Sequence, residues 1–488
     1  MSKLYVFGIG GTGARVIRSL TMLLASGVEP GGNIDTIIPV IIDPDKSNGD
    51  LTRTITSLKD YKTINQSLKF GPSSKSKFFR TKIDDLNTSF RLQVADVEDK
   101  DFQTYINYYQ LDKNNQALVS LLFSKKNLEA HMDLGFKGHP NMGSVVLNNF
   151  STNDGNDLGA ILESFQDGDK IFIISSIFGG TGAAGFPLLL KTLRNATKSD
   201  LPSAALVESA PIGAITVLPY FGVQHDDESE INMDSFISKA KSALSYYRDN
   251  LNVDTLYYIS DKISNNYENN EGDEAQRNNA HLVELISALS IIDFCATGTH
   301  DGRNRYKEFG IEDDVDPVSL KSLSDSTRAL IEKPLISMFV FQKFYRDHLD
   351  KTWDNAWAKS YSYTDDSNQD SKIDKSMMAK DFFVKLTKFL RSFKDEWLIE
   401  MQNNKRSFKP FNHDTSGDNI FYAIDGYQPK KAGLISKIMS KNLVGYDAID
   451  DQIANISNSL HKKLPMYDYF MDVHWQAIDK VLNIKFGI

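Results

Sequence analysis

Leu4-Tyr-Val-Phe-Gly-Ile-Gly-Gly-Thr-Gly13 joins an apolar, strand-like run to the start of a helix through a glycine-rich turn. A second stretch later in the chain has the same form, Ile171-Phe-Ile-Ile-Ser-Ser-Ile-Phe-Gly-Gly-Thr-Gly182. Glycine at such a turn lets the backbone approach a phosphate, and the following helix presents unpaired N–H groups. Two turns of this kind predict that both face one polyphosphate. The predicted phosphate contacts are Gly10, Gly11, Thr12 and Gly13 in the first turn and Gly179, Gly180, Thr181 and Gly182 in the second.

The apolar pattern around the first turn predicts a parallel α/β unit. Residues 4–8 have the character of a buried strand, 14–25 that of a helix with one apolar side, and 34–42 that of a second strand. A strand, helix and strand of these lengths form a right-handed parallel crossover. Further strands are expected at 204–207, 214–218 and 253–260, and a buried central helix is expected at 280–294.

Beyond about residue 315 the pattern changes to apolar residues at helical spacing, as in 382–401. We therefore expect two domains, an α/β domain over 1–295 that ends in the central helix and a mainly helical domain over 296–488. Aromatic side chains such as Phe389 and Trp397 are expected in the core or on a partner-binding face.

Composition narrows the class of protein. The chain has 488 residues, of which 41% are hydrophobic and 24% charged, and its 55 Lys and Arg against 64 Asp and Glu give a net charge of −9. This balance argues against nucleic acid or anionic lipid as the main partner. The single cysteine, Cys295, excludes a disulfide scaffold and a multi-cysteine zinc site, and we expect it to be a core residue.

The sequence contains no membrane-spanning pattern. No uninterrupted apolar window of about 18 residues is present, so no membrane span is predicted. The first apolar run ends at Gly8, and a run of this length is too short for the core of a signal peptide. A cytoplasmic location is therefore expected.

Two acidic residues follow the second predicted strand, in Asp43-Pro-Asp45. They are suited to holding a ribose hydroxyl or a magnesium ion, and equally to capping the turn that follows. In a Rossmann dinucleotide site the acid lies about 20 residues beyond the glycines, whereas Asp43 lies 30 positions after Gly13. No Gly-Lys-Ser/Thr triplet completes the first turn, which argues against a P-loop kinase.

The second turn, continued as Phe178-Gly-Gly-Thr-Gly-Ala-Ala-Gly185, resembles the signature loop of the tubulin/FtsZ superfamily of GTPases. The resemblance continues in the same order to about residue 320. The first turn is similar to that family's first phosphate loop, and Ala214-Ile-Thr-Val-Leu-Pro-Tyr-Phe221 to its strand and ribose loop. Val253-Asp-Thr-Leu-Tyr-Tyr-Ile-Ser-Asp261 resembles the FtsZ strand that begins Val-Asp-Thr-Leu and ends Asn-Asp.

The resemblance implies a role for several further residues. It places Asp43 and Asp45 near magnesium, and Asn141 and Gly143, from Gly138-His-Pro-Asn-Met-Gly143, beside the terminal phosphate. The purine contact falls on Asn278, Asn279 or His281, each of which also suits a helix cap or the surface. Arg15 stands where the family has the asparagine that reads guanine, so guanine and adenine both stay open; the arginine suits a base, a phosphate or a solvated helix face.

Hydrolysis in this superfamily is completed by an acidic loop from the next subunit. The resemblance places that loop in Gly310-Ile-Glu-Asp-Asp-Val-Asp-Pro-Val-Ser-Leu-Lys321, with Asp314 and Asp316 as the catalytic candidates and Ser319 in place of the final acid. A carboxylate there is able to accept a proton from the attacking water. A solvated acidic turn is the other interpretation.

The leading hypothesis is therefore a tubulin/FtsZ-like protein with a parallel-sheet, Rossmann-like GTPase domain and a mostly helical C-terminal region. It implies bound GTP or GDP, accompanying Mg2+, and self-association into a homo-oligomer or filament. A second hypothesis is a non-hydrolysing, nucleotide-bound scaffold whose helical C-terminal region recruits a protein partner. A Rossmann dehydrogenase ranks last, because it leaves the second glycine turn unexplained.

Overall fold

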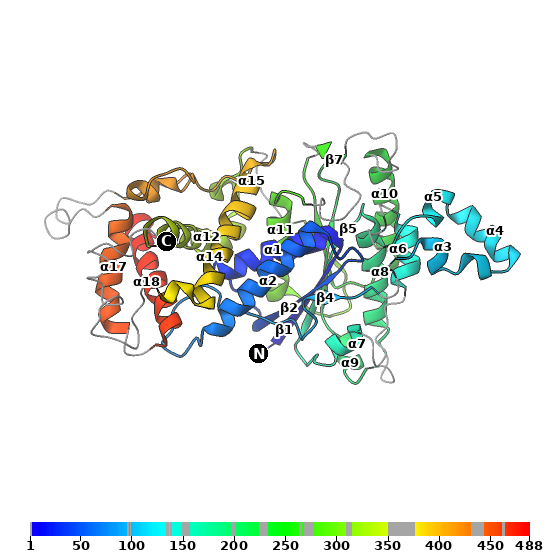
Figure 1. Cartoon of the computed structure of the whole chain (residues 1–488), viewed down its shortest axis with the longest axis horizontal. Coiled ribbons are helices and arrows are strands. Elements are labelled where there is room, and N and C mark those ends of the chain that lie inside the picture. Colours follow the sequence, from blue (N-terminus) through cyan, green and yellow to red (C-terminus); the bar gives the residue numbers. More distant parts are fainter. Residues whose placement is uncertain are drawn as a thin grey trace.

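The structure is a computed structural model of the whole chain (Figure 1). It describes residues 2–94, 97, 99–132, 136, 139–148, 157–196, 201–223, 233–262, 266–267, 277–308, 315–349, 376–430, 444–460 and 464–488.

An eight-stranded sheet forms the centre of the molecule, and all its strand pairs are parallel. The order is β10-β8-β6-β5-β1-β2-β3. β4 also pairs with β2, at Ile41 and Ile42, whereas β3 pairs with it at Thr36 and Ile37. The parallel sheet confirms the predicted fold class. Its strands are β1 (Ser2–Ile9), β2 (Ile34–Ile42), β3 (Lys82–Ile83), β4 (Arg91–Leu92), β5 (Lys170–Ser176), β6 (Ile212–Val217), β8 (Thr255–Ile259) and β10 (Arg305–Glu308). A separate pair joins β7 (Gly222–Val223) and β9 (Asn266–Tyr267).

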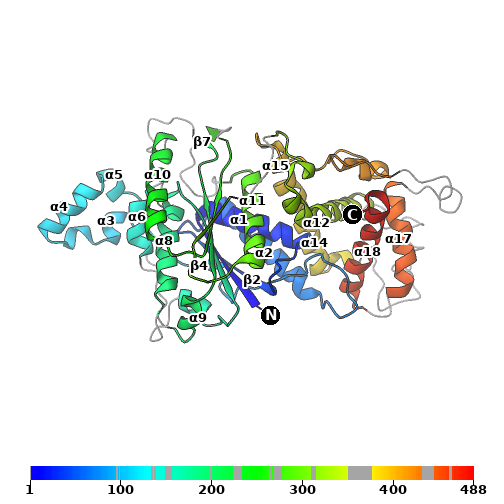
Figure 2. The ribbon, with the colours of Figure 1, turned by 180° about the vertical axis from the view of Figure 1, so that it is seen from behind.

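Helices cover both faces of this sheet, as expected for a parallel sheet whose strands are apolar on both sides. On one face lie α1 (Gly10–Ala25), α2 (Gly49–Ser67) and α11 (Leu282–Thr297) (Figure 1). The other face carries α6 (Pro140–Leu147), α7 (Asp157–Leu162), α8 (Gly180–Arg194), α9 (Ala204–Glu208) and α10 (Met233–Asn250) (Figure 2). The short helices α3 (Phe102–Tyr105), α4 (Lys113–Leu122) and α5 (Lys125–Leu128) form an arm beyond this second face.

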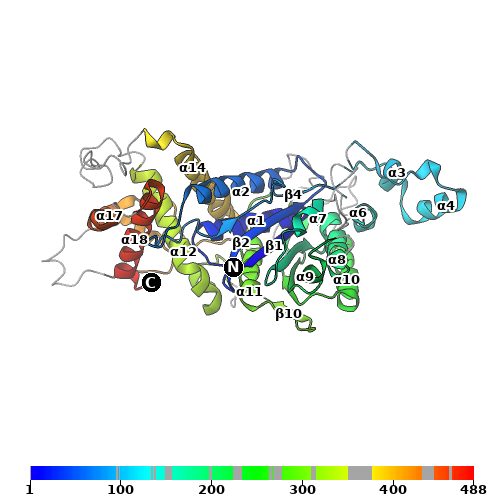
Figure 3. The ribbon, with the colours of Figure 1, turned by 90° about the horizontal axis from the view of Figure 1, so that it is seen from below.

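The C-terminal region is mostly helical, as predicted, and it packs beside α1 and α2 (Figure 3). Trp397 and Phe389 are fully buried, so these aromatic residues belong to the core rather than to an exposed partner face. The elements of this region are α12 (Asp325–Lys343), η3 (Phe344–Leu349), α14 (Asp381–Phe393), η6 (Lys394–Leu398), α15 (Ile399–Asn403), α17 (Gly445–Leu460) and α18 (Met466–Phe486), with shorter 3-10 turns η2 (Leu320–Ser322), η5 (Met377–Ala379) and η7 (Gly417–Ala423). One more 3-10 turn, η1 (Tyr108–Gln110), lies between α3 and α4.

Two features differ from the sequence-based expectation or extend it. The predicted strand at 204–207 is wrong, because these residues form α9, which buries Ala204 and Val207 on one side. A short apolar run is compatible with the period of a strand and with that of a helix. Here the spacing of the two buried residues is that of a helix. The sheet also continues into β10, which follows residue 295, where the first domain was expected to end. Cys295 is buried in α11, as expected of a core residue, and no helix of the described segments is both long and apolar enough to cross a membrane.

One glycine in each turn allows its helix to pack directly against the preceding strand, because glycine has no side chain. A Cβ added to Gly13 would lie 2.4 Å from the backbone carbonyl carbon of Gly8, and one added to Gly182 would lie 2.9 Å from the backbone nitrogen and oxygen of Ser176. Neither distance leaves room for a methyl group. These two glycines are therefore required by packing, independently of any ligand.

We predict that Gly13→Ala and Gly182→Ala each lower the free energy of unfolding by about 1–3 kcal/mol, because the added methyl meets backbone that cannot move aside. Denaturant unfolding measures the change. The matched control is Gly71→Ala, since a Cβ there meets nothing within 4 Å. Equal stability of all three variants would contradict the packing argument.

Candidate functional site

The two glycine turns meet at the carboxyl ends of neighbouring strands. β1 pairs with β5, and the helices that follow them, α1 and α8, leave toward opposite faces of the sheet. This is the point at which the strand order reverses, where parallel α/β sheets bind their ligands. A Cβ built on Gly10, whose φ is +72°, would lie 3.6 Å from the Thr181 Cβ. The two glycine turns therefore lie side by side.

Both helices begin without a side-chain cap among the described residues. Ile9 precedes α1 and Gly179 precedes α8, and neither first turn contains an acidic residue. Some other helices of the chain are capped, as in α2, where the Asn48 side chain accepts two backbone N–H groups, while others, such as α6 and α14, are not. Two uncapped N-termini in contact present free amide groups and two positive dipole ends to one place. This arrangement suits a polyanion.

α6 brings the third predicted phosphate segment against the second turn. A Cβ on Gly143 would lie 3.0 Å from the carbonyl oxygen of Gly180, the first residue of α8, and 2.9 Å from the Ala184 Cβ. Asn141, one residue after the start of α6, is exposed. The glycine therefore allows the close approach of α6, while Asn141 stays open to solvent.

Asp43 and Asp45 follow β2, the strand beside β1. One Asp45 carboxylate oxygen accepts hydrogen bonds from the backbone N–H groups of Ser47 and Asn48, so this residue does cap the turn. Asp43 accepts one from the backbone N–H of Asp45, and burial raises its pKa to about 7. No group of three or more potential metal ligands occurs in the described segments. Because Mg2+ usually takes one or two carboxylates and completes its shell with phosphate oxygens and water, Asp43 and Asp45 fit that ion only beside a phosphate.

Arg15 is held inside the protein and is not a solvated helix residue. Its Nη2 donates to the Tyr220 hydroxyl at 2.7 Å, its Nε lies 2.8 Å from a Glu284 carboxylate oxygen, and its Nη1 lies 3.4 Å from Asp50. Burial raises the pKa of Glu284 to about 7, although Arg15 acts in the opposite direction. Tyr220 falls in the stretch that resembles the ribose loop, whereas no local sequence signal singled out Asp50 or Glu284.

The predicted base contacts have separate environments. Asn278 donates from its backbone and its side chain to the two carboxylate oxygens of Asp50, at 3.1 and 2.9 Å, and Asn279 is exposed. His281 caps α11 by accepting from the Val283 N–H, and its ring lies 4.8 Å from that of Tyr220. Burial, with Arg15 and Arg406 nearby, lowers the pKa of His281 to about 3. The imidazole is therefore neutral at physiological pH.

The same charged cluster continues into the helical C-terminal region. Arg53 pairs with Asp50 at 2.8 Å and with Glu400 of α15 at 2.9 Å. Glu400 also accepts the backbone N–H of Ala280, directly before α11. α15 is thereby bonded to the starts of α2 and α11, close to the residues predicted to contact a base.

Asp316 lies at the same end of the sheet as the glycine turns. Its carboxylate accepts from the backbone N–H of Ser407 at 3.2 Å, and the neighbouring Arg406 lies 3.4 Å from Asp261, just beyond the carboxyl end of β8. α11 leads the chain away from this end of the sheet, and β10, which runs parallel to β8, brings it back. Asp314 lies outside the described residues.

Comparison with known proteins gives remote matches among the solved structures, two of which are the following. No family model matches the chain, and neither does any curated protein. CetZ from Methanosaeta thermophila strain DSM 6194 is 15% identical, with a TM-score of 0.25, over 60% of this chain and 51% of that one. CetZ2 from Haloferax volcanii, solved as a GTPγS-bound protofilament, is 13% identical, with a TM-score of 0.29, over 61% of this chain and 60% of that one. The chain thus spans about half to three-fifths of the length of these proteins. Its fold class is defined by the strand order and parallel pairing of its own sheet.

We predict a pH-dependent effect of Asp43→Asn on stability. Because the pKa of Asp43 is raised to about 7 on folding, the proton it binds favours the folded state at low pH, and this contribution is lost as the pH rises through about 7. The variant avoids that loss. Its free energy of unfolding should therefore improve relative to the unsubstituted protein between about pH 4 and 8, by on the order of 2–4 kcal/mol.

Denaturant titrations across this pH range, without nucleotide or divalent cations, measure the difference. Glu284 titrates in the same direction in both proteins and cancels in the comparison. A difference that stays constant with pH would show that Asp43 is not protonated preferentially in the folded chain.

Proposed function

We propose that this chain binds a guanine nucleotide, GTP or GDP, with its polyphosphate between the two glycine turns. The observation that carries the proposal is the contact between two uncapped helix N-termini, α1 and α8, at the point where the strand order reverses. A single N-terminus suits any small anion. Two that converge suit an extended chain of phosphates.

The surrounding residues fit the parts of such a ligand. Thr12 and Thr181, both partly exposed, add hydroxyl groups to the amides of the two turns. Asn141 is the exposed side chain nearest the start of α6, where a terminal phosphate would lie. Mg2+ would neutralise phosphate charge beside Asp43 and Asp45. At the other end, the neutral His281 ring packs against Tyr220 and both rings are buried, so the exposed Asn279 is the predicted base contact that is open to a purine.

We further propose that the protein is tubulin/FtsZ-like and self-associates. This part rests on the ordered series of sequence segments that resemble the superfamily, from the first turn to the Val253–Asp261 segment. Consistent with that order, β1, β5, β6 and β8 carry these segments and stand side by side in the sheet. The preference for guanine rests on this resemblance alone. The asparagine that reads guanine in the family is replaced here by Arg15.

The proposal has two versions that differ in turnover. In the first, an acid such as Asp316 or Asp314 completes hydrolysis at a subunit contact. In the second, the nucleotide is retained as a structural ligand and the helical C-terminal region recruits a protein partner. The position of Asp316 favours the second version, because a head-to-tail stack would not place this residue in the nucleotide site of its neighbour.

Thr181→Asp should separate binding from stability. A carboxylate in the first turn of α8 interacts favourably with the helix dipole, by about 0.3–1 kcal/mol, but repels phosphate. We expect GTP and GDP affinity to fall at least about tenfold, or about 1.4 kcal/mol, without loss of thermal stability. Thr181→Asn, similar in size but uncharged, is the matched control. Calorimetric titration gives both affinities, and equal binding by the two variants would refute a phosphate site at this turn.

Turnover distinguishes the two versions. The purified protein, at a low and at a high protein concentration, is incubated with GTP. The nucleotide released after denaturation is then identified by chromatography. The scaffold version expects retained triphosphate and a rate per molecule that does not rise with protein concentration. A rate that rises with concentration and is abolished by Asp316→Ala, with binding unchanged, would establish the hydrolysing version instead. Protein that neither carries nor binds any nucleotide would refute both.

A further inference from the structure

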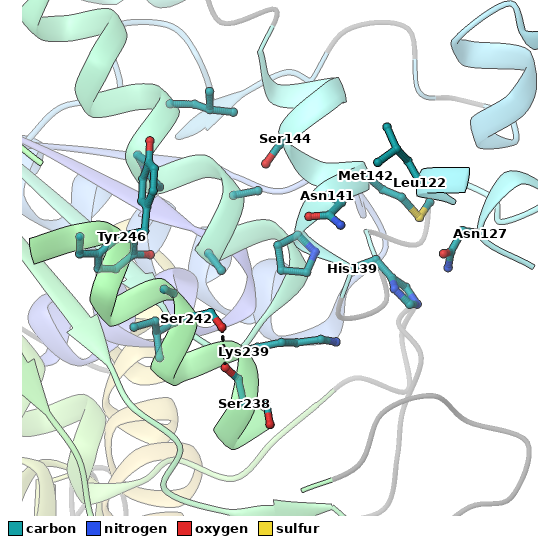
Figure 4. Close-up of a pocket in the computed structure, with 18 of the residues that line it drawn as sticks. Leu122, Asn127, His139, Asn141, Met142, Ser144, Ser238, Lys239, Ser242 and Tyr246 are labelled. Carbon is teal, nitrogen blue, oxygen red and sulfur yellow. Dashed lines mark hydrogen bonds between the residues drawn. The ribbon is translucent and has the colours of Figure 1, made fainter. Parts of the chain in front are cut away.

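The proposed nucleotide site has a phosphate end and a base end. At the phosphate end a cavity of about 640 Å³ lies between α6, α8 and α10, and Asn141, Ala183 and Ala184 are among the residues that line it (Figure 4). The base end lies with α2 and α11, because the predicted base contacts directly precede α11. Neither residues 277–281 nor the described part of the helical C-terminal region line the cavity. The two ends are therefore held by different parts of the chain.

The segment that carries the base contacts, residues 277–281, lies outside any helix or strand. Side chains of α2 hold the backbone of its second residue. The Asn278 N–H donates to an Asp50 carboxylate oxygen at 3.1 Å, and Arg53 donates to the Asn278 carbonyl oxygen at 2.5 Å. The Asn278 side chain adds a further bond to Asp50 at 2.9 Å. One end of the segment is thereby fixed to the nucleotide-binding domain.

The helical C-terminal region holds the backbone two residues later. Glu400 of α15 accepts the Ala280 N–H at 2.9 Å, and Asn404, which ends α15, donates its side-chain amide to the Ala280 carbonyl oxygen at 3.2 Å. Asn279, the exposed base contact, stands between Asn278 and Ala280. Its position is therefore set by α2 on one side and by α15 on the other.

Arg53 joins these two supports. Its guanidinium pairs with Asp50 at 2.8 Å and with Glu400 at 2.9 Å, and the side chains of Arg53, Asp50 and Glu400 are 10%, 0% and 16% exposed. Charge-assisted hydrogen bonds are stronger than neutral ones, and a low local dielectric strengthens them further. Removal of the Glu400 carboxylate would leave the Ala280 N–H without this acceptor, while Asp50 still held Asn278. The base segment would lose one support and keep the other.

We propose that Glu400 is a positioning residue for base recognition, through which the helical C-terminal region controls how tightly the nucleoside part of the ligand is held. This inference rests on the proposed function and divides that site into two parts. The glycine turns bind the phosphates, and α15 fixes the segment that meets the base. Because coupling between two sites is reciprocal, bound nucleotide also strengthens the seating of α15 against α2 and α11.

Calorimetric titration of the full chain with GTP, and with tripolyphosphate as a phosphate chain without a nucleoside, tests the assignment. For Glu400→Ala we expect GTP affinity to fall at least about fivefold, the lower end of typical coupling between sites, and tripolyphosphate affinity to stay within about twofold. Glu400→Gln keeps an oxygen for the Ala280 N–H and should recover part of the GTP affinity. A variant that had lost its fold would bind neither ligand.

Asp395→Ala removes a carboxylate from the same helical run and serves as the control. Asp395 pairs with Arg391 and Lys394, which belong to that run. We expect this variant to keep both affinities. Thr181→Asp should weaken both ligands, since it acts on the phosphates, whereas Glu400→Ala should weaken GTP alone.

Equal GTP affinity of Glu400→Ala and the unsubstituted protein would overturn the proposal. An equal loss for GTP and tripolyphosphate, or an equal effect of Asp395→Ala, would also overturn it. GTP binding that is lost in Thr181→Asp but unchanged in Glu400→Ala would leave the proposed phosphate site standing and reject only the role of Glu400. If the unsubstituted protein binds neither ligand, the proposed function fails and this inference fails with it.

Discussion

The parallel pairing of β1 with β5 is the contact on which the site depends. Its register sets Gly8 opposite Ile174, so the two strands end at nearly the same level of the sheet. Because α1 and α8 then turn to opposite faces, their first turns meet at the edge and nowhere else. A shift of this register would separate the two N-termini while leaving each turn intact. The proposed ligand site is therefore a property of the strand pair rather than of either glycine turn.

The buried charges around Arg15 have a different role. Ion pairs taken out of water contribute little net stability, because desolvation offsets most of their attraction, but the loss of one partner is costly. Arg15, Asp50, Glu284 and Arg53 are bonded to one another and, through Glu400, to α15. This cluster specifies how the helical region is seated against α1, α2 and α11. It also explains why Arg15 is turned inward rather than toward solvent.

Sequence patterns predicted the parts of the fold that depend on local periodicity. The strand at 34–42 was found with its observed bounds, and the helix after the first turn with its observed end but a start four residues late, because long apolar runs are local signals whereas the glycines hide where the helix begins. α9 was mistaken for a strand, since a run of a few apolar residues contains no clear period. The partners of Arg15 were not predicted either. Asp50 and Glu284 are distant in sequence, and only the tertiary fold brings them to one arginine.

The position of Asp316 also constrains the symmetry of any assembly. The glycine turns and this acid share one end of the sheet, because β10 carries the chain back to it. A contact in which each copy's Asp316 approached the other's turns would join like end to like end, and such an interface is isologous. An isologous contact is satisfied by two copies and leaves no surface for a third. Filament growth would have to use a different, head-to-tail surface, so dimerisation and polymerisation would be separate properties of this molecule.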